Sequence, residues 1–572
     1  MVSKKSLNKF LDKIHSPLWL VILLAIILIL RIPSFLEPYS YGDEMIYLTL
    51  GQGIRQGIPL YKGIYDNKPP LLYLMAAIAG NLFWFRVLLA AWNLATIFLF
   101  WKLSQALFPK GKRLQKISTI IFALLTTIPR LEGNIANAEL FMIGPIIAAF
   151  LIIFTQKNNF KNLFIAGLLF SIATLFKIPA IFDVPAIIFV WIVTSNLKIK
   201  KLKLVAKKTL YLGAGLLVPI ATTFLWYLVK GAFNEYLAAA YLQNFGYLSS
   251  WRPEDVVDPF LIRNGPLLIR AGVISLGLVI LYWKRKKLSK QFVFITAWLL
   301  LNLFAITLSE RPYPHYLLQA VPAVSLLFGV LITKETLEQC LSIIPLALFF
   351  FIPVYFNFWY YPVTPYYVRF IKFATKNITK EEYFDSFGGH IKRNYEIAEF
   401  LTQSTSKSDW VFVWGGNDSM VYALSRRLPP LKYVADYHIK DFSNQEEIKK
   451  LWEEKIAKNK DVIVEKIPFK DFVGTIILIN ILIIALVVLV QIFLPPQIPL
   501  FYGLPEGEAQ LAPSLSLIIP SLVSLVIMIT NITISYFLKD EILKKFLITT
   551  AIGVSIFSIV TTIKIVLLVG SF

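Results

Sequence analysis

The fold is decided by an uninterrupted apolar stretch near the beginning of the chain. Residues 18–30 read LWLVILLAIILIL, and four lysines precede them between positions 4 and 13. A basic segment before such a run is typical of a signal peptide, but no small-residue cleavage site follows it. We therefore interpret the run as an uncleaved signal anchor whose basic end lies in the cytoplasm.

Ten further apolar runs extend this pattern to residue 356. They lie at about 84–104, 117–131, 139–155, 162–178, 179–196, 209–229, 265–283, 291–308, 314–332 and 339–356. Crossing a bilayer takes about 20 apolar residues. An ordinary soluble domain is about 45–50% apolar, whereas this chain of 572 residues is 57% hydrophobic and only 16% charged. These features predict a polytopic α-helical membrane protein whose core, residues 1–356, has eleven spans.

The formal net charge of +22 is explained by where the basic residues lie. Basic clusters separate alternate runs, at 110–113, 157–161, 198–208, 284–287 and 334. Each cluster falls on the side that the positive-inside rule makes cytoplasmic when the N-terminus is cytoplasmic. The charge therefore reports topology, and we predict no nucleic-acid partner. A single cysteine, Cys340, excludes an internal disulfide and a cysteine metal cluster.

The composition changes after the eleventh run and stays polar over residues 357–470. Strand-like segments at 410–414, 432–434 and 461–465 alternate with helix-like segments at 418–426 and 443–458. This alternation predicts a small extracytoplasmic α/β domain.

Three more apolar runs, at about 472–494, 514–537 and 546–568, predict a three-span C-terminal module of unknown function over residues 471–572. Its topology conflicts with the positive-inside rule. If residues 357–470 lie outside, the acidic loop 495–513 is cytoplasmic and the basic segment 539–545 is outside. Either the module was acquired separately or one span is misassigned, and both explanations stay open.

The first outer loop, residues 34–83, is the richest in candidate functional residues. Asp43 and Glu44 are adjacent, so on a helix they diverge by roughly 100° and only one of them can face a given atom. Lys68 precedes two prolines, which favour an extended backbone there and a helix immediately after. That helix, about 70–82, is short for a crossing and is predicted to be interfacial.

Other polar candidates stand at span ends or in later outer loops. They are Arg86, Glu139, Lys177, Arg311, Tyr313 and His315. Arg, Lys, His and Tyr donors that converge at an outer membrane surface suit a phosphate or pyrophosphate group. Ordinary alternatives remain for each, because span-end Lys and Arg side chains commonly snorkel. In the same way His315 can be a packed interfacial histidine, and a lone acidic pair is most often a solvated turn.

Taken in order, these pieces resemble the GT-C membrane glycosyltransferases, most closely the protein O-mannosyltransferases and lipid A aminoarabinose transferases. The resemblance rests on Gly42-Asp43-Glu44, Gly57-x-Pro-Leu-Tyr61, Asp66-Asn-Lys-Pro-Pro-Leu71, Asn137-Ala-Glu139, Phe176-Lys-Ile-Pro179 and Arg311-Pro-Tyr-Pro-His-Tyr-Leu-Leu-Gln319. It covers roughly residues 15–435. The first-loop motifs are specific, whereas the later ones are individually weak and gain from their order.

The resemblance implies transfer of a sugar from a polyprenyl monophosphate carrier to an acceptor at the extracytoplasmic face. Asp43 matches the family's catalytic aspartate, and direct displacement with this base would invert the anomeric centre. Glu44 would hold the acceptor or the loop. Glu139 takes the place of the family's second acidic residue, where aspartate is common. The donor phosphate would be bound by Lys68, Arg311, Tyr313 and His315, with Lys177 and Arg86 behind them.

Several partners and conditions stay open at this point. No cofactor is required by the residues, although some family members bind a divalent ion near the first acidic pair. The acceptor can be a lipid, a glycan or a protein. The composition favours the plasma membrane of a prokaryote. A transporter or flippase of lipid-linked sugars is the alternative function, because it would share the spans and the basic headgroup site.

Overall fold

The computed structural model describes residues 17–569 except 247–258, 334, 414–417, 436–437, 439–468, 492–493, 502–509 and 539–540. The described chain is mostly helical and divides into two compact units, Met1–Lys449 and Lys450–Phe572. Each unit is described by itself.

All eleven apolar runs of the first unit form helices. These are α2 (Leu18–Phe35), α5 (Leu82–Leu107), α6 (Lys112–Leu125), α7 (Ala138–Thr155), α8 (Phe160–Phe176), α9 (Val184–Ser195), α10 (Ile199–Val229), α13 (Phe260–Lys284), α14 (Lys290–Thr307), α15 (Val321–Thr333) and α16 (Leu337–Tyr355). Across both units, eleven helices of the described chain are long and apolar enough to cross a membrane. The apolar helices α8 and α15 are shorter. The prediction of a polytopic α-helical membrane protein is confirmed.

Two glycines let the helices α8 and α10 pack closely against each other. A Cβ added at Gly167 would overlap the Leu212 carbonyl oxygen, and one at Gly215 would overlap the Phe164 carbonyl oxygen. Small residues at facing positions let helix backbones approach closely, which is how membrane helices commonly associate.

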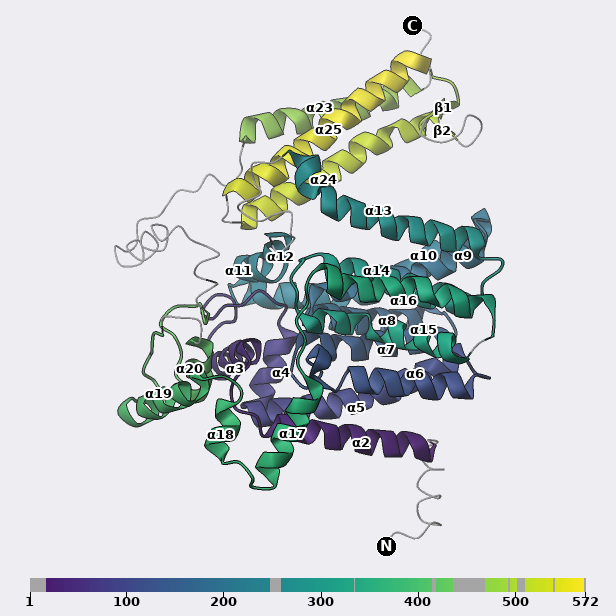
Figure 1. Cartoon of the computed structure of the whole chain (residues 1–572). Helices are drawn as coiled ribbons and strands as arrows, with labels where there is room; N and C mark the ends of the chain where they lie inside the picture. The colour runs from purple at the N-terminus through teal and green to yellow at the C-terminus, as the bar shows by residue number, and fades with distance from the viewer. Residues whose placement is uncertain are drawn as a thin grey trace. The chain divides into compact units, whose positions relative to one another are not determined.

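Short elements collect at one end of the long helices of this unit, where α3, α4 and α17–α20 lie in Figure 1. From the first loop come α3 (Gly42–Arg55) and α4 (Leu71–Ala79), and from later loops η1 (Pro129–Leu131), η2 (Ile178–Asp183), α11 (Phe233–Leu237), η3 (Ala238–Leu242), α12 (Gln243–Gly246) and η6 (Pro314–Gln319). The predicted interfacial helix is thus α4, which begins one residue later than expected, after Pro70.

The described part of residues 357–435 is largely helical, with α17 (Val363–Ala374), α18 (Lys380–Asp385), α19 (His390–Ser404) and α20 (Asp418–Ser425). Two of the predicted strands contribute isolated bridges, Trp410 with Leu428 and Tyr433 with Tyr65. The predicted helix 443–458 and strand 461–465 lie outside the described residues. The division at residues 356 and 470 stays a prediction.

The three C-terminal runs of the second unit are also helices. They are α23 (Lys470–Val490), α24 (Ile519–Phe537) and α25 (Glu541–Val569); β1 (Gln497–Pro499) pairs antiparallel with β2 (Leu511–Pro513), and η9 (Ser514–Ile518) leads into α24. Asn480 of α23 accepts a 2.8 Å hydrogen bond from Ser524 of α24, and both side chains are buried. Such a bond between apolar helices helps to fix how they pack.

Candidate active site

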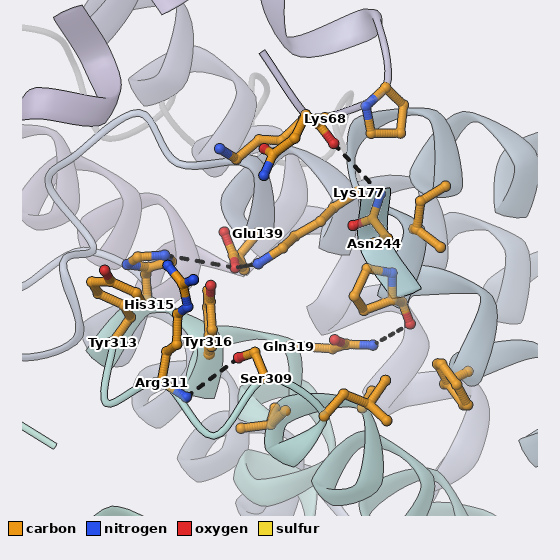
Figure 2. Close-up of a pocket in the computed structure, with 18 of the residues that line it drawn as sticks. Lys68, Glu139, Lys177, Asn244, Ser309, Arg311, Tyr313, His315, Tyr316 and Gln319 are labelled. Atoms are coloured by element: carbon orange, nitrogen blue, oxygen red, sulfur yellow. Dashed lines mark hydrogen bonds and ion pairs between the residues drawn. The ribbon is translucent and has the colours of Figure 1, made fainter. Parts of the chain in front are cut away.

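A cavity of about 740 Å³ opens among the short elements of the first unit. Several separate parts of the chain supply its polar lining: the start of α3, the 67–69 turn, the start of α7, the junction of α8 and η2, η3 with α12, and the stretch from the end of α14 to η6. Seven of the nine predicted site residues line it, namely Asp43, Lys68, Glu139, Lys177, Arg311, Tyr313 and His315. Figure 2 shows most of them converging on one space.

Asp43 and Glu44 occupy the first turn of α3, where acidic side chains suit the positive end of the helix dipole. As the helical spacing predicts, they point in different directions. Asp43 lines the cavity with its side chain 35% exposed, and its Oδ2 accepts a 2.9 Å hydrogen bond from the Tyr47 hydroxyl. Glu44 is fully buried behind it. Of the pair, Asp43 is the carboxylate that a ligand in the cavity can reach.

Glu44 is held in a buried ion network with Arg86. The Arg86 guanidinium donates to both carboxylate oxygens of Glu44, at 3.0 and 2.6 Å, and to Glu37 at 2.7 Å. Glu44 also accepts a 2.8 Å hydrogen bond from the Ala136 backbone N–H, which ties α3 to the loop between η1 and α7. Arg86 does not line the cavity, so the structure does not bring it to the other residues that the sequence assigned to the donor phosphate.

Lys68 sits between two carboxylates of the first loop. Its Nζ lies 3.7 Å from Asp66 and 4.0 Å from Asp43. The Tyr73 hydroxyl accepts from the Lys68 backbone N–H at 2.9 Å and donates to Asp66 at 2.8 Å. Burial by itself would raise the pKa of Asp66, but Lys68 and His438 lower it well below its usual value. The turn therefore holds the Lys68 amine at the cavity wall beside Asp43.

Glu139 and Lys177 form an ion pair across two helix ends. Glu139 lies in the first turn of α7, and Lys177 follows the last residue of α8. Both are largely buried, and the Lys177 ammonium lies 3.8 Å from the centre of the Tyr316 ring. Burial lowers the pKa of Lys177, although Glu139 acts in the opposite direction. Figure 2 shows the lysine extended through the cavity toward the glutamate.

Arg311, Tyr313 and His315 reach the cavity from the loop that leads into η6. Arg311 lies outside any helix, whereas His315 is in the first turn of η6, which begins at Pro314. The Tyr313 ring stacks on the His315 ring, with centroids 5.6 Å apart. In Figure 2 the Arg311 side chain lies beside His315.

The His315 ring lies between two glutamates, Glu132 and Glu139. Its Nδ1 contacts buried Glu132, and its Nε2 lies 3.9 Å from Glu139. Glu132 has a left-handed backbone (φ 58°) and also accepts a 2.8 Å hydrogen bond from the Tyr41 hydroxyl. Burial would lower the pKa of His315, but Glu139 and Glu132 outweigh it and raise that pKa above the usual value. The two glutamates therefore favour a positively charged imidazole.

The cavity as a whole suits an amphiphilic anion. Its lining carries four basic side chains, Lys68, Lys177, Arg311 and His315, against the two carboxylates Asp43 and Glu139. Apolar side chains from η2 and the end of α14 form another part of the wall: Ile178, Pro179, Ile181, Phe182, Ala305, Ile306 and Leu308. Cationic donors bind phosphate, and the apolar wall offers a place for a hydrocarbon chain.

Within the described ranges, the structure contains no group of three or more His, Cys, Asp or Glu side chains that could hold a metal ion. The prediction that no cofactor is required, with a divalent ion left open, is unchanged by this observation.

Three residues that support the cavity lining could not be identified from the sequence. The sequence gives no role to Glu132 or His438, and it includes Asp66 only as the first residue of the motif that ends at Leu71. Each is buried and contacts a cavity residue or its support. A buried carboxylate next to a lysine or histidine is a recognisable sign in a structure, but the partners here are far apart along the chain.

Comparison with known proteins yields solved structures only. No protein-family profile and no curated protein matches the sequence. The chain is similar to ArnT from Cupriavidus metallidurans bound to undecaprenyl phosphate, with a TM-score of 0.48 and 14% identity over 76% of this chain and 91% of that one. For the same protein in the apo state the TM-score is 0.46, at 14% identity over 72% and 85% of the two chains. The archaeal oligosaccharyltransferase AglB from Archaeoglobus fulgidus, in complex with an inhibitory peptide and a dolichol-phosphate, gives a TM-score of 0.35 at 14% identity, over 73% of this chain and 64% of that one.

Proposed function

We propose that the protein is a glycosyltransferase that moves a sugar from a polyprenyl-monophosphate donor to an acceptor at the extracytoplasmic face of the membrane. One observation carries the proposal. Asp43, the residue that matches a catalytic aspartate, lines the same cavity as Lys68, Lys177, Arg311 and His315, which suit a phosphate. These residues come from segments far apart in the sequence, so their convergence is not a consequence of local structure.

The cations would act on the leaving group. Breaking the bond between the anomeric carbon and the phosphate oxygen leaves a second negative charge on the polyprenyl phosphate. Fixed cations at that oxygen stabilise the charge as it develops, which lowers the barrier of the transfer. Lys68 and Arg311 are the primary candidates for this contact, and Lys177 and His315 stand beside them in the cavity. The apolar wall of η2 and α14 would take the first isoprene units.

Asp43 would act as the base. It takes a proton from the acceptor hydroxyl or amine while that atom attacks the anomeric carbon opposite the phosphate, and the configuration inverts. Tyr47 fixes the carboxylate through its hydrogen bond to Oδ2. Glu44 supports the turn that presents Asp43, through its pairing with Arg86. Glu139 holds Lys177 in the cavity.

A direct assay separates this function from lipid transport. Purified protein is incubated with candidate polyprenyl-phosphate sugars and with lipid, glycan or protein acceptors, and the released polyprenyl phosphate is measured. A glycosyltransferase releases it in step with glycosylated acceptor. A flippase moves the intact lipid-linked sugar between leaflets and releases none, and that result would replace our proposal.

Arg311→Ala is expected to weaken donor use. Losing one charge-assisted contact to phosphate costs about 1.5–3 kcal/mol, so the apparent KM for the donor should rise about tenfold or more. Lys68→Ala should act in the same direction. The control is the KM for the acceptor, which should change little in either variant. A change confined to the acceptor KM would show that these residues do not contact the donor phosphate.

Donor binding should also weaken as the pH rises. His315 has a raised pKa, so it stays protonated to a higher pH than an ordinary histidine of pKa about 6.5, and its charge is lost as the pH passes that raised value. Glu132→Gln removes one of the two glutamates that stabilise the charge, so the loss of affinity should begin at a lower pH. Affinity for polyprenyl phosphate is measured from pH 6 to 9 in both proteins, side by side, because the lipid phosphate titrates too. Identical profiles would contradict a charged His315 in the site.

A further inference from the structure

His438 lies against the part of the first loop that carries Lys68, although it is far along the chain. Its Nε2 is 3.1 Å from Oδ1 of Asp66. Both side chains are almost fully buried, at 1% exposure each. Burying a charged or polar pair is costly unless the partners satisfy one another, so this contact demands an explanation beyond packing.

Asp66 connects His438 to Lys68 in two ways. Its other carboxylate oxygen, Oδ2, lies 3.7 Å from the Lys68 ammonium. The same oxygen accepts the hydrogen bond of Tyr73, whose hydroxyl in turn receives the Lys68 backbone N–H. The Asp66 carboxylate thus interacts directly with the Lys68 side chain and, through Tyr73, with the Lys68 backbone. Its other oxygen, Oδ1, is contacted by His438.

Residues 432 and 433 lie against the same turn. The Tyr65 backbone N–H donates to the Lys432 carbonyl at 2.7 Å, and the backbones of Tyr65 and Tyr433 form an isolated β-bridge. The rings of Tyr65 and Tyr433 are also in contact, with centroids 5.3 Å apart. The Tyr65 ring also meets the His438 ring edge-on, with centroids 5.4 Å apart. The turn at residues 65–68 is therefore held by contacts from Lys432, Tyr433 and His438, at the point where the first loop reaches the cavity.

We propose that His438 is a positioning residue for Lys68. By holding Asp66, it fixes the lysine ammonium at the cavity wall and so makes His438, together with residues 432 and 433, part of the site. The inference rests on the proposed function in that Lys68 is taken to bind the donor phosphate. The contact itself does not depend on which reaction the cavity performs.

Kinetics provide the first test. His438→Ala should raise the apparent KM for the polyprenyl-phosphate sugar about tenfold, the effect of one lost contact to a charged group. The acceptor KM and the thermal unfolding midpoint should stay close to those of the wild type. His438→Gln, which keeps a donor toward Asp66, should recover most of the loss. His390→Ala is the matched control, since this histidine opens α19 and lies outside the cavity lining.

Chemistry at Lys68 itself provides a second test that needs no substrate. Reductive methylation of the folded, purified protein is followed at Lys68 by peptide mass spectrometry. A loosened turn exposes the amine more often, so His438→Ala should methylate at Lys68 about threefold faster than the wild type. His390→Ala should match the wild type.

The two tests separate failure of this inference from failure of the proposed function. A raised donor KM with faster methylation supports the positioning role. Unchanged values for both in a folded His438→Ala protein overturn it. If the wild type transfers no sugar, the methylation experiment alone decides. Faster methylation of Lys68 in His438→Ala supports the positioning role of His438, and an unchanged rate refutes it. Should His438→Ala not fold, Asp66→Asn, which keeps the shape of the side chain, is judged by the same measurements.

Discussion

Asp43→Asn is expected to abolish sugar transfer while the protein still inserts and folds. The amide has nearly the same shape as the carboxylate, and it sits at a partly exposed position in the first turn of α3. It cannot accept the acceptor's proton, however, and a positioned general base contributes about 10²–10⁴-fold to a rate. Released polyprenyl phosphate should therefore fall by at least about a hundredfold.

The control for Asp43→Asn is its affinity for polyprenyl phosphate, which is measured separately from turnover. Lys68, Lys177, Arg311 and His315 are untouched by the substitution, so the affinity for polyprenyl phosphate should change little. A second variant, Glu139→Gln, removes the other carboxylate of the cavity. It should act mainly through Lys177, whose partner it is, and so on the donor KM. Turnover of Asp43→Asn near that of the wild type would remove Asp43 as the base.

Helix geometry explains why part of this site could be predicted from the sequence. The divergence of Asp43 and Glu44 follows from their adjacency on any helix, and the structure confirms it, with one residue in the cavity and the other buried. The spans follow equally from length and apolarity. These are local properties, because they depend only on residues that are close together in the sequence.

Pairing at long range explains what the sequence could not reveal. An arginine at the start of a span, such as Arg86, has the same local pattern whether it snorkels, binds a phosphate or joins a buried network. Only the fold brings it to Glu37 and Glu44. His315 and Glu132 are 183 residues apart, and their contact depends on how two loops of the fold meet. A repeating pattern in the sequence cannot predict a contact between residues so far apart.

Arg86→Met is expected to destabilise the protein strongly, because it leaves Glu37 and Glu44 buried without their shared cation. Removing one partner of a buried ion pair costs about 3–5 kcal/mol, and methionine fills much of the space, so little of this cost comes from a cavity. The thermal unfolding midpoint in detergent or nanodiscs measures the effect. Arg113→Met, at an exposed position in α6, is the matched control and should leave the midpoint unchanged.

The same variant separates the two roles that Arg86 can have. If Arg86 supports α3 from behind, adding Glu37→Gln and Glu44→Gln to Arg86→Met should restore part of the stability, because neutral amides are less costly to bury without a cation. Protein that remains folded should then bind polyprenyl phosphate about as well as the wild type, since the cations that line the cavity are intact. A raised donor KM with an unchanged unfolding midpoint would instead assign Arg86 to the donor phosphate. It would also mean that α3 moves enough to open a path from the cavity to the buried guanidinium.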